Sequence, residues 1–157
     1  MKRNDLTFLD TNGWMALLNS DDRLHSSAVE AWREIGRRRG IVVLTDWIIA
    51  ETGNGLARTE RRKAFAGAVR LLPTIPEVRL ILIDEDLITR AVDLYQARPD
   101  KDWGLVDCSS FVVMTRENIR DAMTSDRHFS HAGFRSLLSD PGGKSQATNE
   151  TELHPPH

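Results

Sequence analysis

The sequence predicts one α/β domain, in which a central, mostly parallel sheet of four to five strands carries helices on both faces. Short apolar runs alternate along the chain with longer segments of helical periodicity, the pattern of parallel strands joined by helical crossovers. A length of 157 residues with 40% hydrophobic residues is enough for one domain with its own core. The single cysteine excludes an internal disulfide, so packing must stabilise the fold, and a reducing compartment such as the cytoplasm suits the chain.

The expected strands are short runs of apolar and β-branched residues. They cover residues 6–10, 41–44, 79–83 and 119–123, and the last of these is the weakest. Helical spacing of apolar residues between them predicts helices over residues 13–19, 26–39, 46–51, 60–72, 84–98 and 103–118. Gly40 and Pro73 end two of these helices. The expected N-caps of three others are Asp46, Asp84 and Asp102.

The last part of the chain differs in composition from the rest. Residues 139–157 contain prolines and glycines but almost no apolar side chains, so we expect a disordered tail after a folded domain of residues 1–138. Three acidic side chains and one basic side chain lie in residues 140–157, which accounts for the net charge of −2 and leaves the body neutral. No apolar run approaches the roughly 20 residues of a membrane-spanning helix, so no membrane association is expected.

Four acidic residues are expected to meet at one edge of the sheet. In open parallel sheets the functional crevice lies outside the carboxyl ends of the strands. Asp10 directly ends the first strand, and Asp126 follows the fourth. Glu51 and Asp107 each lie five residues after an expected aspartate cap, about one turn into helices that begin at this edge. All four carboxylates can therefore converge.

Clustered carboxylates imply a bound cation, because like charges in a partly dry cleft repel one another and raise each other's pKa. Oxygen ligands without an accompanying set of cysteines and histidines favour Mg²⁺ or Mn²⁺ over zinc. Such ions acidify water and stabilise the charge that develops when a phosphodiester is attacked. With four carboxylates neutralised, the body would carry four positive charges, which is compatible with RNA binding without being evidence for it. The competing interpretation is that these acids are ordinary caps and turn residues, and Asp10 fits it least.

Four segments of the sequence are distinctive: LDTN at residues 9–12, AE at 50–51, DKDWGLVDCSSFVVM at 100–114 and TSDRHFSHAGF at 124–134. In this order they resemble the motifs of PIN-domain ribonucleases of the VapC toxin type, over residues 7–138. The resemblance implies a PIN-like three-layer fold and a Mg²⁺- or Mn²⁺-dependent endoribonuclease. It also implies an RNA substrate, a homodimer and a cognate antitoxin that holds the enzyme inactive. The implied metal ligands and catalytic acids are Asp10, Glu51, Asp107 and Asp126.

Other residues are candidates for supporting roles. Asp102 lies in the third segment and is a further candidate ligand, in competition with its capping role. Asn12 and Ser125 sit beside ligand positions, where they could orient water or a phosphate oxygen or simply satisfy turns. Basic residues can contact phosphates, although charged residues at helix ends are often only solvated. The candidates are Arg58, Arg61, Arg62 and Lys63, together with the run at residues 37–39.

Several other interpretations stay open. His128 and His131 could cleave RNA by metal-free acid–base catalysis, which excess EDTA would distinguish from a metal mechanism. Cys108 could be a nucleophile, but no histidine partner is suggested near it. A phosphatase could use Asp10, but the second aspartate two residues on is missing. The four tryptophans could stack on RNA bases, although most fit apolar helix faces. The main alternative function is a non-catalytic PIN-like module that binds RNA or protein.

Overall fold

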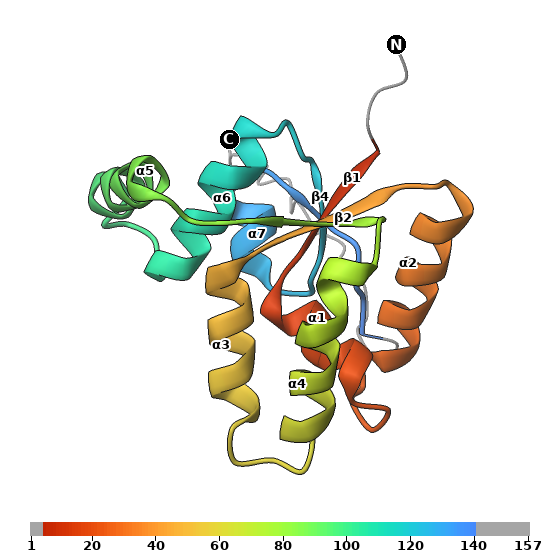
Figure 1. The fold of residues 1–157 in the computed structure, drawn as a ribbon. Coiled ribbons are helices and arrows are strands. Elements are labelled where there is room, and N and C mark those ends of the chain that lie inside the picture. Colours follow the sequence, from red (N-terminus) through yellow and green to blue (C-terminus); the bar gives the residue numbers. More distant parts are fainter. Residues whose placement is uncertain (1–4, 141–157) are drawn as a thin grey trace, which may run out of the picture.

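The computed structural model describes residues 5–140, and a five-stranded sheet forms its centre (Figure 1). The strands lie in the order β3-β2-β1-β4-β5, and every neighbouring pair is parallel. Three of the four residues of the central strand β1 are buried, as expected for a parallel strand covered on both faces. The predicted parallel α/β sheet is therefore confirmed. The strands are β1 (Leu6–Leu9), β2 (Ile41–Thr45), β3 (Val78–Ile81), β4 (Asp121–Met123) and β5 (Arg135–Ser136).

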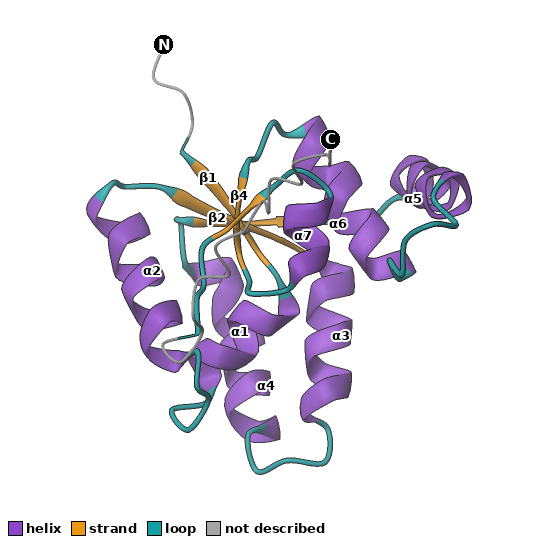
Figure 2. Cartoon of the chain, turned by 180° about the vertical axis from the view of Figure 1, so that it is seen from behind, coloured by secondary structure: helices purple, strands orange, loops and turns teal. Residues whose placement is uncertain are grey.

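The helices connect the strands and form two groups. The chain moves from β1 to β2 and β3 in one direction, then returns across the sheet to β4 and β5. Because parallel crossovers are right-handed, this reversal places α5–α7 on the opposite face from α1–α4. The two groups lie on different sides of the strands in Figures 1 and 2. The helices are α1 (Thr11–Leu18), α2 (His25–Arg37), α3 (Asp46–Leu56), α4 (Arg62–Leu71), α5 (Glu85–Ala97), α6 (Leu105–Arg116) and α7 (Arg127–His131), with a 3-10 turn η1 (Leu72–Thr74) after α4.

The strand order reverses between β1 and β4, and their carboxyl ends define the crevice where open α/β sheets bind ligands. Gly13, in the first turn of α1, makes this junction close. A Cβ atom added there would lie 2.1 Å from the carbonyl oxygen of Met123, at the end of β4. Any side chain at residue 13 would therefore push α1 away from β4.

Buried aromatic rings fix α6 and α7 against the sheet. The Phe111 ring in α6 lies 5.0 Å from the rings of Trp103 and Phe129 and 5.6 Å from that of Phe134, between centroids. Edge-to-face and stacked contacts of this kind add to the hydrophobic stabilisation of burial. Phe111 lies one turn after Asp107, so this anchor also fixes the helical turn that carries the Asp107 carboxylate.

The predicted N-cap of α3 is wrong. Thr45 caps this helix, because its hydroxyl accepts the backbone N–H of Ile48 at 3.1 Å. The carboxylate of Asp46 instead accepts the N–H of Ile83 at 2.8 Å, which holds the start of α3 to the segment after β3. Residue 83 thus leaves the sheet, and β3 ends earlier than expected.

The predicted N-cap of α6 is also wrong. The helix begins at Leu105 with Gly104 in the N-cap position, while Asp102 is exposed and makes no hydrogen bond to residues 5–140. Glu51 and Asp107 therefore lie six and three residues after their caps, and the expected equivalence of the two positions does not hold. Only Asp84 caps as expected, accepting the N–H of Leu87 at 2.9 Å.

The end of the described chain lies against the start of α2. The N–H of Ser139 donates to the Ser27 hydroxyl at 3.3 Å, and Asp140 forms an ion pair with Arg23 at 3.3 Å. Disorder was predicted from residue 139 onward, but residues 139 and 140 are held by these contacts, and the remaining residues of the predicted tail, 141–157, fall outside the described residues. Within residues 5–140, no helix has both the length and the apolar character needed to cross a membrane.

Candidate active site at the carboxyl edge of the sheet

Asp10 is the buried acid of the site. It follows β1 directly, its side chain is only 5% exposed, and the Thr124 hydroxyl donates to its Oδ2 at 2.9 Å. Burial raises the pKa of this carboxyl from 3.8 to about 7, against the hydrogen bonds from Thr124 and the Thr11 backbone. The charges of Glu51 and Asp107 raise it further. A cation placed here would therefore stabilise the ionised form.

Asp107 lies in the first turn of α6. Burial is the largest influence that raises the pKa of its carboxyl, and the charges of Asp126 and Glu51 act in the same direction. The backbone N–H of Gly104 donates to Oδ2 at 3.0 Å and, with the nearby His128, lowers this pKa. This bond is one half of a capping box, and Gly104 has no side chain to form the other half. Because the bond uses only Oδ2 of Asp107, the second carboxylate oxygen is left for a ligand.

Glu51 and Asp126 complete the acidic group. Glu51 is half-buried in the second turn of α3, and its charge acts on both Asp10 and Asp107. Asp126 caps α7, because its Oδ1 accepts the N–H of His128 at 2.9 Å. Each of the four acids thus interacts electrostatically with at least one other, as the positions of β1, α3, α6 and β4 predict.

Polar side chains fasten the ends of β1 and β4 together. The Thr124 hydroxyl, which donates to Asp10, also accepts the N–H of Asp126 at 3.0 Å. Next to it, Asn12 Oδ1 accepts the backbone N–H of Ser125 at 2.8 Å and its hydroxyl at 3.2 Å. Asn12 and Ser125 therefore bind each other across the junction, which is the turn-satisfying role that the sequence left open.

The donor set fits a hard divalent cation. All four acids offer oxygen atoms, and mutual repulsion together with the burial of Asp10 and Asp107 disfavours the cation-free ionised state. Among the described residues, 5–140, no three Asp, Glu, His or Cys side chains lie close enough together to coordinate one metal ion. Mg²⁺ usually takes only one or two protein carboxylates and keeps several waters, so pairs of these acids suffice.

Other candidates are not brought into this group. Asp102 is exposed and is not among the charges that raise the pKa of Asp10 or Asp107. His131 is exposed as well, whereas His128 is half-buried near Asp107. The Cys108 thiol is buried, and this burial raises its pKa, which disfavours the thiolate that a nucleophile requires.

Thr124 is the site residue that sequence reasoning missed. It lies in the segment TSD directly after β4 and is fully buried. A hydroxyl two residues before an acid at a strand end was the available signal, but threonine is common in β-strands for its shape alone. Only its contact with Asp10, which follows a strand distant in sequence, reveals the role of Thr124.

Comparisons with known proteins agree with this architecture. The family model described as PIN domain matches residues 7–135, which include all four acids. The 23S rRNA-specific endonuclease VapC20, from two strains of Mycobacterium tuberculosis, is 32% identical over 130 residues, covering 82% of this chain and 95% of the relative. A crystal structure of Mycobacterium tuberculosis VapC20, described as a sarcin–ricin loop cleaving toxin, superposes with a TM-score of 0.75 at 27% identity, covering 85% of this chain and 99% of that one. The chain belongs to the PIN-domain family, and the resemblance to VapC-type proteins is confirmed.

Proposed function

We propose that this protein is a Mg²⁺- or Mn²⁺-dependent endoribonuclease that hydrolyses RNA phosphodiester bonds, and that it is the toxin of a toxin–antitoxin pair. The relationship to VapC20 supports a ribonuclease. The observation that carries the proposal is the group of four interacting acids at the strand-order reversal, with a buried Asp10 whose pKa is raised to about 7. Acids that served only to stabilise the fold would not be expected to gather beside one another, because their like charges repel.

The side chains of the site have two roles, holding metal and orienting the groups that hold it. Pairs of acids from the group Asp10, Glu51, Asp107 and Asp126 would hold divalent ions, which would supply an acidified water and positive charge for in-line attack on a phosphodiester. Thr124 fixes the orientation of the Asp10 carboxylate through its 2.9 Å hydrogen bond and keeps that oxygen from turning away. The N–H groups of Gly104 and His128 do the same for Asp107 and Asp126. Three of the four acids are thus preorganised before any ligand arrives.

The test is cleavage of RNA by the purified protein with Mg²⁺, with Mn²⁺ and with excess EDTA. We expect cleavage only with a divalent ion. We expect none from the variant Asp10→Asn, which keeps the shape of the side chain but removes its negative charge. Undiminished cleavage in EDTA would overturn the metal mechanism and favour His128 as an acid–base group. RNA binding without cleavage under every condition would instead support a non-catalytic module.

An apolar groove between α2, α4 and the sheet supports a protein partner such as the antitoxin. Two adjoining cavities of about 520 and 200 Å³ share Trp32, Val42 and Ile75. Trp32 and Leu71, beside them, are 38% and 58% exposed, which is unusual for side chains of this size. The test is co-purification with the product of an adjacent small open reading frame. Trp32→Ala is expected to weaken that complex and Arg116→Ala, on the other face, to leave it intact.

An exposed apolar stripe on α5 supports a homodimer. Ile88, Val92 and Tyr95 follow the helical spacing of one face and are 40%, 43% and 55% exposed. A second copy would cover this stripe and bury it from water. Sedimentation of the wild type and of Val92→Glu tests the assignment. A dimer that persists in this variant would contradict it.

A further inference from the structure

The helical hairpin made by α3, residues 57–61 and α4 carries a concentration of positive charge. Residues 52–71 contain five basic side chains and one acidic side chain, although the whole chain has a net charge of −2. We propose that this hairpin binds the phosphate backbone of an RNA strand, over several nucleotides beside the scissile bond, through Arg58, Arg62 and Lys63. The inference rests on the proposed function and deepens it by assigning a binding surface for the substrate.

Helix α3 leads from the candidate active site to the turn of the hairpin. Glu51 lies in the second turn of α3, and Arg58 lies two residues beyond the end of this helix at Leu56. The face of α3 that packs into the protein carries the buried Ile48, Thr52 and Leu56. From Glu51 to the end of the helix at Leu56, α3 advances about 8 Å along its axis, and Arg58 follows in the turn. An RNA strand bound at the acids can therefore reach the turn within a few nucleotides.

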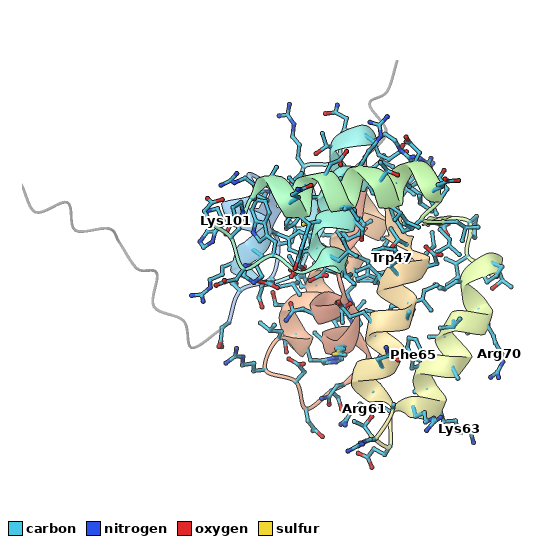
Figure 3. The ribbon with its side chains drawn as sticks, turned by 90° about the vertical axis from the view of Figure 1, so that its left-hand side faces the viewer. Trp47, Arg61, Lys63, Phe65, Arg70 and Lys101 are labelled. Carbon is cyan, nitrogen blue, oxygen red and sulfur yellow. The ribbon has the colours of Figure 1, made fainter. Side chains whose placement is uncertain are left out.

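The structure also shows which basic side chains of the hairpin are free to bind phosphate. Arg61 is not, because its side chain is only 23% exposed and forms ion pairs with Asp21 at 3.4 Å and Glu60 at 3.7 Å. Arg58, Arg62 and Lys63 are exposed and form no ion pair with residues 5–140. Figure 3 shows Arg61 and Lys63 at the far end of the hairpin. The four contacts predicted from sequence thus reduce to three.

The surface chemistry of the turn favours RNA over a protein partner. Protein interfaces depend on buried aromatic or aliphatic anchors, whereas nucleic-acid binding depends on phosphate neutralisation. Between residues 54 and 70, no large apolar side chain is exposed. The exposed ones lie elsewhere on the described chain, on α2, on β3 and directly after it, on α5, and at the ends of α4 and α6. An acidic protein segment would find charge at the turn but no apolar contact to anchor it.

The exposed arginines in and just after the last turns of α2 provide a matched control, namely Arg33, Arg37, Arg38 and Arg39. Arg37 pairs with Glu30 and Glu34, and Arg38 pairs with Asp5. This run precedes β2, so it lies at the amino edge of the sheet, opposite the candidate active site. Removing charge there changes the net charge of the protein equally without touching the hairpin.

The experiment measures the binding of a fluorescent single-stranded RNA by anisotropy, in EDTA to suppress cleavage, over a range of salt concentrations. The test variant is Arg58→Gln/Arg62→Gln/Lys63→Gln, and the control is Arg33→Gln/Arg37→Gln/Arg39→Gln. Each lost phosphate contact should reduce the slope of log affinity against log salt by about 0.7, so the test variant should lose about 2. Between about 50 and 200 mM salt the wild-type affinity should then fall roughly 20-fold more than that of the test variant. The control should follow the wild type.

Equal slopes for the wild type and the test variant would overturn the proposal, as would an equal loss in the control. Loss of poly-glutamate binding in the test variant, with RNA binding intact, would assign the hairpin to an acidic protein and overturn it too. Failure of the proposed function is seen separately, as absence of RNA cleavage by the wild type in Mg²⁺. Single substitutions at the same three exposed positions, each expected to reduce the slope by about 0.7, test the proposal if the triple variant unfolds.

Discussion

The substitution Asp10→Asn should stabilise the metal-free protein, and increasingly so as the pH rises. The pKa of the Asp10 carboxyl is raised from 3.8 to about 7 in the folded state, mainly by burial. Below pH 3.8 the carboxyl is protonated in both the folded and the unfolded chain, so it has no effect on stability. Between these two pKa values only the unfolded chain releases the proton, and the free energy of unfolding of the wild type falls as the pH rises.

The magnitude follows from the size of the shift. A change of one pKa unit corresponds to about 1.4 kcal/mol, so the full penalty above pH 7 is on the order of 4 kcal/mol. The difference in unfolding free energy between variant and wild type should therefore widen by about 2.5 kcal/mol from pH 5 to pH 8. Asparagine keeps an acceptor for the Thr124 hydroxyl, so of the two hydrogen bonds that lower the pKa of Asp10 only the smaller influence, that of the Thr11 backbone, is at risk.

Urea unfolding of both proteins at several pH values in EDTA measures this difference. A constant difference across this pH range would refute the reasoning, because Asp10 would then be ionised without cost in the folded state. Repeating the series with Mg²⁺ adds a second readout. Wild type should gain stability by mass action, about 2.7 kcal/mol at a concentration one hundred times the dissociation constant, and the variant should gain much less.

Three further predictions concern Asp107, Thr124 and the segment after Asp140. Asp107→Asn should abolish cleavage while the protein still folds cooperatively in EDTA, and a loss of stability equal with and without Mg²⁺ would mean that Asp107 only caps α6. Thr124→Val should reduce kcat about 10- to 100-fold, as does loss of residues that orient metal ligands, and Thr124→Ser should restore most of it because the hydroxyl returns. An unaffected Thr124→Val enzyme would remove Thr124 from the positioning role. A chain ending at Asp140 should unfold at the same urea concentration as the full chain, and a lower midpoint would show that residues 141–157 stabilise the fold.

The larger elements were predictable because each has a strong local signal. Residues 41–44 of β2 are all apolar and three of them are β-branched, and α2 has helical spacing followed by a glycine at residue 40. The smallest elements, β5 with two residues and α7 with five, have too few residues to show a period and were not predicted. β5 forms because Arg135 and Ser136 pair with β4, a contact that no local pattern encodes.

The site was predictable as a set but not in its detail. The rule that parallel sheets place function at their carboxyl edge locates Asp10, Glu51, Asp107 and Asp126 together, since each follows a strand or begins a helix at that edge. Cap assignment failed at Asp46 and Asp102 because aspartate, threonine and glycine all serve as N-caps, and tertiary contacts choose between them. Asp46 does not cap α3, because its carboxylate accepts the N–H of Ile83, a residue on a distant segment.

The capping and metal-binding interpretations of Asp107 and Asp126 do not exclude each other. Each carboxylate has two oxygens, and in each case one oxygen accepts a single backbone N–H. An N–H bond of this kind favours the ionised form that a metal ligand requires, and it also fixes the carboxylate, so that less entropy is lost when an ion binds. Asp10 differs, because its fixed oxygen is held by a side chain and its burial opposes ionisation. The site therefore combines two acids whose carboxylates are fixed by backbone N–H groups with one buried acid that a cation must stabilise, which makes Asp10 the position where metal binding and folding are most strongly linked.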